Sequence, residues 1–138
     1  MLSYKKKILV VEDCDSDVSL LKHMLGSAGG IKEMDIASVS RLIDAFQRID
    51  EERFDVILLD LNLIDMDGVA SVSALAAEAP HLPIIVYSGM EDRRIKEEAL
   101  LCGASQYLVK GHEDGHSLRH AINLASGRYP AMQERSAV

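Results

Sequence analysis

The chain is poor in cysteine and in basic charge and has no long apolar run, and each shortage argues against a class of protein. Its two cysteines, Cys14 and Cys102, lie far apart without a CxxC pair, so a disulfide framework and a closed zinc site are not expected. No apolar stretch approaches the roughly 20 residues that span a bilayer. The first residues lack a signal-peptide core followed by a cleavage site. We therefore expect a soluble, reduced, cytoplasmic protein without a membrane partner.

Basic residues are also too few to indicate a nucleic-acid partner. Lysine and arginine number 15 against 22 acidic residues, and the formal net charge is −7. A nucleic-acid-binding protein needs a clustered basic face. The one basic run, residues 5–7, precedes an expected strand and is typical of a solvated chain start.

The composition is that of one folded domain. The 138 residues are 48% hydrophobic and 27% charged, which suits a single domain with a sizeable core. The sequence shows no internal repeat, low-complexity tract or interdomain linker. We expect one domain over about residues 5–127 and a short tail over residues 128–138 that frays or docks loosely.

Short, continuous apolar runs rich in β-branched residues predict buried strands. Strands that helices cover on both faces are apolar throughout, whereas strands with one wet face alternate. Four runs have this character and a fifth, weaker run completes the set: residues 8–11, 56–59, 84–87 and 107–109, and residues 34–37.

The segments between the runs have apolar residues at helical spacing. These faces run from Val18 to Ala28, stopped by Gly29-Gly30; Leu42 to Ile49; Val69 to Ala79, ended by Pro80; Ile95 to Leu100, closed by Gly103; and Leu118 to Ala125, ended near Gly127. Strand and helix therefore alternate five times, which predicts a doubly wound α/β fold with helices on both faces of a parallel sheet.

Polar side chains follow the ends of four of these strands. In an open parallel sheet, ligands bind beyond the carboxyl ends of the strands. Glu12 and Asp13 follow the first strand, Asp60 the third, Ser88 the fourth and Lys110 the fifth. Three carboxylates, a hydroxyl and an ammonium group are therefore expected to converge on one edge of the sheet.

This set of groups predicts phosphoryl chemistry. Three neighbouring carboxylates repel one another unless a cation neutralises them, and hard oxygen ligands suit Mg²⁺. A metal ion, an ammonium and a hydroxyl together can stabilise the oxygens of a phosphoryl group. A carboxylate can itself be the nucleophile. Asp60 is the best candidate because it follows a central strand and is flanked by the other groups.

Five motifs in this order resemble the receiver domain of two-component response regulators, over about residues 5–127. They are Glu12-Asp13 after residues 7–11, Asp60 within residues 55–63, the Asp67-Gly68 turn, Ser88-Gly89, and residues 103–110. The resemblance implies a flavodoxin-like fold, in which a five-stranded parallel sheet of order 2-1-3-4-5 is covered by five helices. It also implies a signalling domain rather than an enzyme.

The resemblance further implies the roles of the acidic residues. Asp60 would accept a phosphoryl group from a sensor histidine kinase or a histidine phosphotransfer protein. Asp13 and Asp60 would ligate Mg²⁺ (or Mn²⁺) directly, Glu12 largely through a bound water, and Asn62 through its backbone carbonyl.

The remaining roles implied by the resemblance concern the response to phosphorylation. Lys110 would pair with the phosphoryl oxygens, and the Ser88 hydroxyl would swing in to hydrogen-bond another. Tyr107 matches an aromatic residue that changes rotamer when that hydroxyl moves, although simple packing on a half-buried strand is the alternative reading. The face of the fourth helix, fifth strand and fifth helix would contact a downstream partner, and a weak homodimer is compatible with this.

The sequence departs from the family pattern at three loop positions. Gly111 follows Lys110 where proline is usual, so a cis peptide is not expected there. Ile64 stands where many relatives have proline, and Ser88 replaces the commoner threonine. These changes affect loop shape and the lifetime of the phosphoryl group and remove no chemical group from the site.

Other functions fit the sequence less well. A small Mg²⁺-dependent phosphatase or phosphotransferase with an aspartyl nucleophile would need a second acid where Asn62 stands. A flavin carrier would need a Ser/Thr/Gly-rich loop where residues 12–15 are acidic. A receiver-like binding module that is not phosphorylated would not need the full set of five groups. His112, His116 and His120 are spaced for a metal on a helix, but Gly111 and Gly115 favour a solvated helix start.

Overall fold

The structure, a computed structural model, confirms the doubly wound α/β fold. It describes residues 5–27, 34–63, 65–66 and 68–127. The strands are β1 (Lys6–Val11), β2 (Met34–Val39), β3 (Val56–Leu59), β4 (Ile84–Ser88) and β5 (Gln106–Val109). The helices are α1 (Asp15–Ser27), α2 (Leu42–Glu51), α3 (Ala70–Glu78), α4 (Arg93–Leu101) and α5 (Gly115–Ala125).

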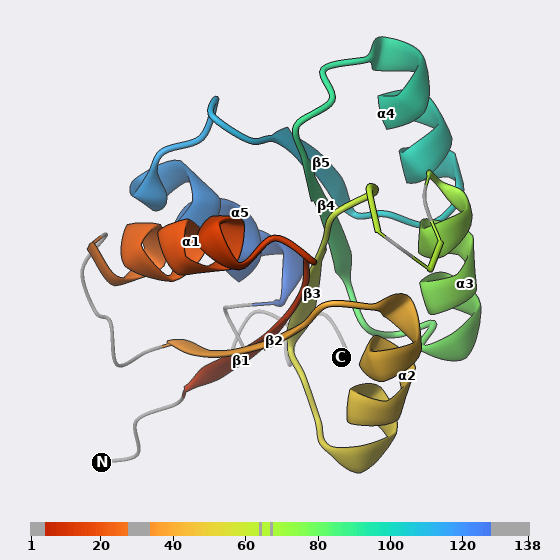
Figure 1. Ribbon diagram of the computed structural model, residues 1–138, viewed down its shortest axis with the longest axis horizontal. Coiled ribbons are helices and arrows are strands. Elements are labelled where there is room, and N and C mark those ends of the chain that lie inside the picture. Colours follow the sequence, from red (N-terminus) through yellow and green to blue (C-terminus); the bar gives the residue numbers. More distant parts are fainter. Residues whose placement is uncertain (1–4, 28–33, 64, 67, 128–138) are drawn as a thin grey trace, which may run out of the picture.

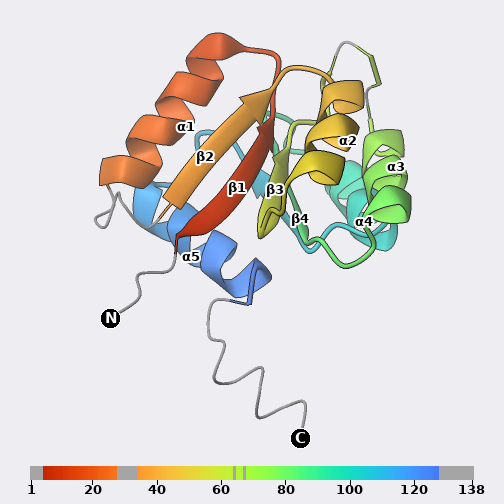
Figure 2. The same cartoon turned by 90° about the horizontal axis from the view of Figure 1, so that it is seen from below.

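All strand pairs are parallel, and the sheet has the predicted order β2-β1-β3-β4-β5. Figure 1 shows α1 and α5 on one face of the sheet and α2, α3 and α4 on the other. The strand β2 lies at an edge and is only half-buried, which explains why its run is the weakest in the sequence. Figure 2 shows this edge of the sheet, with β2 lying beside β1.

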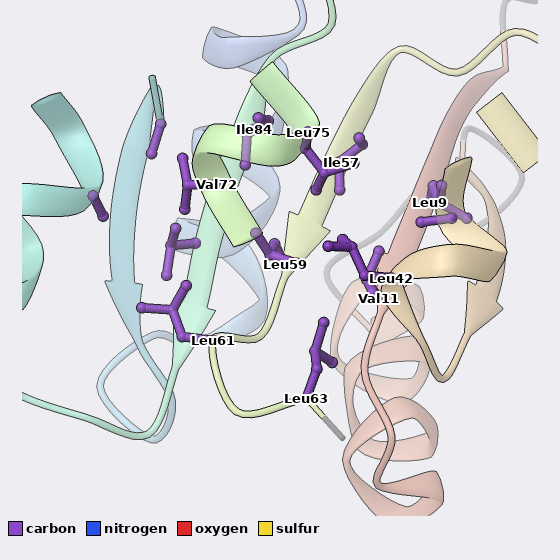
Figure 3. Packing of buried hydrophobic residues seen from close by; sticks show 14 of the residues in the cluster. Leu9, Val11, Leu42, Ile57, Leu59, Leu61, Leu63, Val72, Leu75 and Ile84 are labelled. Carbon is purple, nitrogen blue, oxygen red and sulfur yellow. The ribbon is translucent and has the colours of Figure 1, made fainter. Parts of the chain in front are cut away.

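Two apolar cores cover the two faces of the sheet, because successive side chains of a strand point to opposite sides. Leu9 and Val11 of β1 belong to the core under α2, α3 and α4, which Figure 3 shows. Ile8 and Val10 belong to the core under α1 and α5. The central strands β1 and β3 are thus buried on both sides, as their continuous apolar runs predict.

The helix ends agree with the sequence signals where these can be checked. α3 ends before Pro80, and Gly103 follows α4 with a φ of +124°. α5 begins in a capping box in which the side chains of Asp114 and Ser117 bond each other's backbone N–H. Gly115 is the first residue of α5, so the helix begins after His112, which lies in the preceding loop as expected. The predicted stop at Ala28, Gly29 and Gly30, and the predicted tail, lie outside the described residues.

The N-terminus of α2 is capped from a distant loop. Its own N-cap residue, Arg41, makes no side-chain cap hydrogen bond. Instead the Asp65 carboxylate accepts hydrogen bonds from the backbone N–H groups of Leu42 (2.9 Å) and Ile43 (3.1 Å). The hydrogen bond from Leu42 is the largest cause of a lowered pKa at Asp65. The loop that follows β3 is thereby tied to α2.

We expect Asp65→Ala to lower the free energy of unfolding by about 1 kcal/mol, the usual value of a capping side chain. Because the folded-state pKa of Asp65 is lowered, its contribution is present above the ordinary carboxyl pKa and is lost as the pH falls through the folded value. Urea unfolding at neutral and acidic pH measures both effects. An equal difference between wild type and Asp65→Ala at the two pH values would contradict this account.

Candidate functional site

Backbone hydrogen bonds continue past the strand ends and fix the residues that follow them. The N–H of Glu12 donates to Val39 O (2.9 Å), and that of Asp60 donates to Val11 O (3.0 Å). At the carboxyl ends of β4 and β5, along the same edge of the sheet, the N–H of Lys110 donates to Ser88 O (2.8 Å). The backbone that carries the side chains at this edge is therefore held by the sheet itself, as the position of the polar residues at the strand ends predicts.

The loop that carries Asp60 is anchored because two of its side chains, at alternate positions, are buried in the core. Leu61 is fully buried and Leu63 is 5% exposed, both in the core shown in Figure 3, while Asn62 between them is exposed. Asn62 N–H lies 3.4 Å from Asp60 Oδ1. Further along the loop, Gly68 has a φ of +74°, and its N–H donates to Leu61 O (2.8 Å). Ile64 and Asp67, singled out in the sequence, lie outside the described residues.

Glu12, Asp13 and Asp60 form an acidic cluster. Each offers a carboxylate oxygen, and these oxygens lie within 4.8 Å of one another. Glu12 and Asp60 are both buried, at 7% exposure, and Asp13 is half-buried. Burial raises the pKa of Glu12; the hydrogen bond from Lys110 opposes that rise, and the charge of Asp60 adds to it. Closely spaced, buried hard oxygens fit a divalent cation such as Mg²⁺, which removes their repulsion.

Lys110 lies against this cluster and contacts three carboxylates. Its Nζ is 2.5 Å from Glu12 Oε1, 2.9 Å from Asp17 Oδ2 and 3.7 Å from Asp60 Oδ2. Burial alone lowers the pKa of Lys110, but the hydrogen bonds with Glu12 and Asp17 and the nearby negative charges outweigh it and raise the pKa. Lys110 is therefore a fixed positive charge beside Asp60.

Of the three carboxylates that Lys110 contacts, Asp17 is the one that was not predicted from the sequence. It lies in the first turn of α1, four residues after Asp13. Because α1 begins at Asp15, Asp17 lies in the first helical turn after the acidic pair Glu12-Asp13. This spacing of four residues from Asp13 is the sequence signal that could have indicated Asp17. Its contact with Lys110 spans 93 residues of sequence, which local patterns do not reveal.

Ser88 and Tyr107 both contact the backbone of Met90, in the loop that follows β4. Ser88 is buried, and its Oγ accepts a hydrogen bond from Met90 N–H (3.2 Å). The Tyr107 hydroxyl donates to Met90 O (2.7 Å), and its ring packs in the core under α2, α3 and α4. Burial is the main cause of a raised pKa at Tyr107. The hydroxyl of Ser88 and the ring of Tyr107 are thus linked through one loop.

These groups surround one hollow at the carboxyl edge of the sheet, which we call the acidic hollow. Its volume is about 470 Å³, and Cys14, Asp17, Gly89 and Met90 complete its wall together with the predicted residues. The lining residues predicted from sequence are Glu12, Asp13, Asp60, Asn62, Ser88 and Lys110. Tyr107 is not among the lining residues and reaches the site through Met90.

His112 and Gly111, also considered as candidates in the sequence, both lie in the loop between β5 and α5. His112 lies in the loop before α5, where its Nε2 is 3.6 Å from Glu91 Oε1. Within the described part of the chain, no group of three metal-ligating side chains includes a histidine. Gly111 has a φ of +89°, which proline cannot adopt, and the described residues contain no cis peptide. Gly111 therefore gives the loop after Lys110 a backbone conformation that the proline usual at this position could not adopt.

Comparison with known proteins gives the family. Residues 8–123 match the family model of the response regulator receiver domain. The chain therefore belongs to the response regulator receiver domain family of two-component signalling systems. None of the helices in the described residues is long and apolar enough to cross a membrane.

The similar proteins share the domain and extend beyond it. The transcriptional regulatory protein ZraR of Salmonella typhimurium is 32% identical over 110 residues, which cover 80% of this chain and 24% of ZraR. The alkaline phosphatase synthesis transcriptional regulatory protein PhoP of Bacillus subtilis is 31% identical over 105 residues, covering 76% of this chain and 42% of PhoP. The chain thus spans less than half the length of these relatives.

Solved structures share the fold over nearly the whole chain. The signal receiver domain of an HD domain-containing protein from Pseudomonas fluorescens Pf-5 superposes with a TM-score of 0.81 at 20% identity, covering 98% of this chain and 96% of that one. The receiver domain of the sensor histidine kinase PA1611 from Pseudomonas aeruginosa has a TM-score of 0.74 at 26% identity, with 89% and 98% coverage. That structure holds a magnesium ion in its active-site cleft.

Proposed function

We propose that this chain is a phosphoacceptor switch, in which Asp60 receives a phosphoryl group from a phosphohistidine. The observation that carries the proposal is the gathering of Glu12, Asp13 and Asp60 within 4.8 Å of one another, with Lys110 alongside. A carboxylate oxygen of Asp60 attacks the phosphorus, the bond from phosphorus to the histidine nitrogen breaks, and the imidazole leaves. Hydrolysis later returns the carboxylate and inorganic phosphate.

The acidic cluster is the proposed site for Mg²⁺ or Mn²⁺. Asp13 and Asp60 would hold the ion directly, Glu12 largely through a bound water, and Asn62 through its backbone carbonyl. When bound, the ion supplies positive charge that neutralises the carboxylates and the phosphoryl oxygens. The chemistry of the donors supports this, because all of them are hard oxygens.

Lys110 and Ser88 are the proposed contacts of the phosphoryl oxygens. The Lys110 ammonium stands 3.7 Å from Asp60 Oδ2, so a short movement brings it to a group bonded there. The Ser88 hydroxyl would turn from Met90 N–H toward the phosphoryl group. Because Tyr107 bonds the carbonyl of the same Met90, that movement offers a route from the site to the surface near α4 and β5.

The proposed partners are a sensor histidine kinase or a histidine phosphotransfer protein, in the cytoplasm. The face formed by α4, β5 and α5 would carry the signal to a downstream protein or to a weak homodimer. We propose a signalling role without an enzymatic activity on a separate substrate, and without nucleic-acid binding by this domain. A phosphatase-type reaction would need an acid in place of the exposed Asn62. A module that is not phosphorylated would leave the acidic hollow without a use.

A magnesium titration followed by NMR tests the site. We expect saturable shifts at Glu12, Asp13 and Asp60 that a chelator reverses, and much smaller ones at Asp35, an exposed acid of β2 on a different part of the sheet. Asp13→Asn should weaken the binding by at least roughly tenfold, since it removes one direct carboxylate ligand. Equal responses at Asp35 and Asp60 would mean that the ion binds the acidic surface without a specific site.

A further inference from the structure

The resting position of Lys110 is set by two carboxylates from different elements. Its ammonium hydrogen-bonds Glu12, which follows β1, and Asp17, on α1. An ammonium group has three donors, and the third faces Asp60 at 3.7 Å, which is too long for a hydrogen bond. Asp17 is neither the proposed phosphoacceptor nor a proposed metal ligand, so its contact with Lys110 needs a separate explanation.

The two partners of Lys110 differ in how readily they can be exchanged. The Glu12 side chain is 6% exposed, and an unpaired charge there would be costly. The Asp17 side chain is 42% exposed, so water can replace the ammonium at its carboxylate. An ion pair is weaker the more its partners are exposed to water. Of the two partners, Asp17 is therefore the one that Lys110 leaves at the lower cost.

The surroundings of Lys110 leave room for this movement. Besides the acidic hollow, Lys110 lines a second, apolar cavity of about 120 Å³, walled by Leu20, Leu21 and Met24 of α1. Asp17 also lines both hollows. The ion pair between Lys110 and Asp17 thus lies between two open spaces.

We propose that Asp17 is a positioning residue that holds Lys110 away from Asp60 in the resting protein and competes with the phosphoryl group for its ammonium. The inference rests on the function proposed above. When a phosphoryl group is bonded to Asp60, Lys110 stays on Glu12, leaves Asp17 and pairs with a phosphoryl oxygen. Asp17 then opposes phosphorylation, and its carboxylate on α1 loses its partner each time the switch is turned on.

Beryllofluoride, a phosphoryl mimic, tests the competition at saturating Mg²⁺. We expect Asp17→Asn to lower the dissociation constant of beryllofluoride about two- to fivefold, the range that corresponds to one partly exposed ion pair. Asp15→Asn is the matched control, because it removes the same charge from an exposed acid in the same helical turn. Asp17→Glu, which restores a carboxylate, should return the constant toward the wild-type value.

A second measurement follows the position of Lys110 directly. In beryllofluoride-free Asp17→Asn, the Lys110 ε-methylene resonance should move toward its position in beryllofluoride-bound wild type, and in Asp15→Asn it should not. The inference is overturned if Asp17→Asn binds beryllofluoride no more tightly than Asp15→Asn, or if the resonance does not move. A wild-type protein that fails to bind beryllofluoride at all overturns the proposed function as well, which separates the two failures.

Discussion

Asp60→Asn is expected to abolish phosphorylation, while the wild-type protein takes up one phosphoryl group from acetyl phosphate in the presence of Mg²⁺. The amide of asparagine is neutral and a poor nucleophile, and it also removes one carboxylate from the cluster in which the oxygens lie within 4.8 Å. The change is nearly isosteric, so the loop that Leu61 and Leu63 anchor in the core should keep its position. Intact-mass measurement of the two proteins after the same incubation reads the result.

Asp15→Asn is the matched control for this experiment. Asp15 is exposed at the start of α1, close along the chain to Glu12 and Asp13, but is not among the residues that line the acidic hollow. The control should be labelled as fully as wild type. Equal labelling of Asp60→Asn and wild type would show that another residue takes the phosphoryl group.

Lys110→Ala is expected to separate phosphoryl binding from the conformational response. The substitution removes the ammonium that lies 3.7 Å from Asp60 Oδ2 and leaves the carboxylates of the cluster in place, so Mg²⁺ binding should persist. Losing one charged donor to the transferring group should slow phosphorylation by roughly 100-fold. Beryllofluoride should then no longer shift the resonances of Tyr107, whose hydroxyl bonds the carbonyl of Met90 beside the site.

The control for this change is Lys22→Ala, which removes an exposed lysine of α1 away from the acidic hollow. Its Tyr107 resonances should respond to beryllofluoride as those of wild type do. If Tyr107 responds normally in Lys110→Ala, the signal does not depend on the lysine. The route would then start at Ser88 alone.

The sequence was sufficient to predict the fold because the fold depends on a strong, regular signal. The runs at residues 8–11 and 56–59 are apolar throughout because helices cover both faces of β1 and β3, and both runs are fully buried or nearly so. The weaker run at residues 34–37 is the edge strand β2, where one side has no neighbouring strand and the demand for apolar residues is lower. There the structure extends the strand to Val39, beyond the predicted end.

The location of the site was predictable for a related reason. In a parallel sheet the carboxyl ends of the strands lie at a known edge, so Glu12, Asp60 and Lys110, which follow their strands, and Ser88, which ends β4, could be brought together without knowing any distance. The orientation of Tyr107 was not predictable. Its burial depends on its packing in the core and on the hydrogen bond to Met90, which lies 17 residues away in sequence.

The contacts that could not be predicted from the sequence are long-range contacts of one partly exposed and one exposed acid. Asp17 pairs with Lys110 across the site, and Asp65 caps α2 from the loop after β3. Both residues lie in segments where an acid reads as ordinary helix-start or loop chemistry. Their partners are fixed by how elements pack, and only the folded structure supplies that information.

The central claim is that Asp60, in its acidic cluster, captures a phosphoryl group with the help of a divalent ion. Borohydride reduction of the acetyl phosphate-treated protein converts an aspartyl phosphate into homoserine, and peptide mass spectrometry then locates the change. We expect homoserine at position 60 alone, and only when Mg²⁺ is present during the labelling. Conversion at another aspartate, or equal conversion at position 60 in the presence of a chelator, would contradict the account.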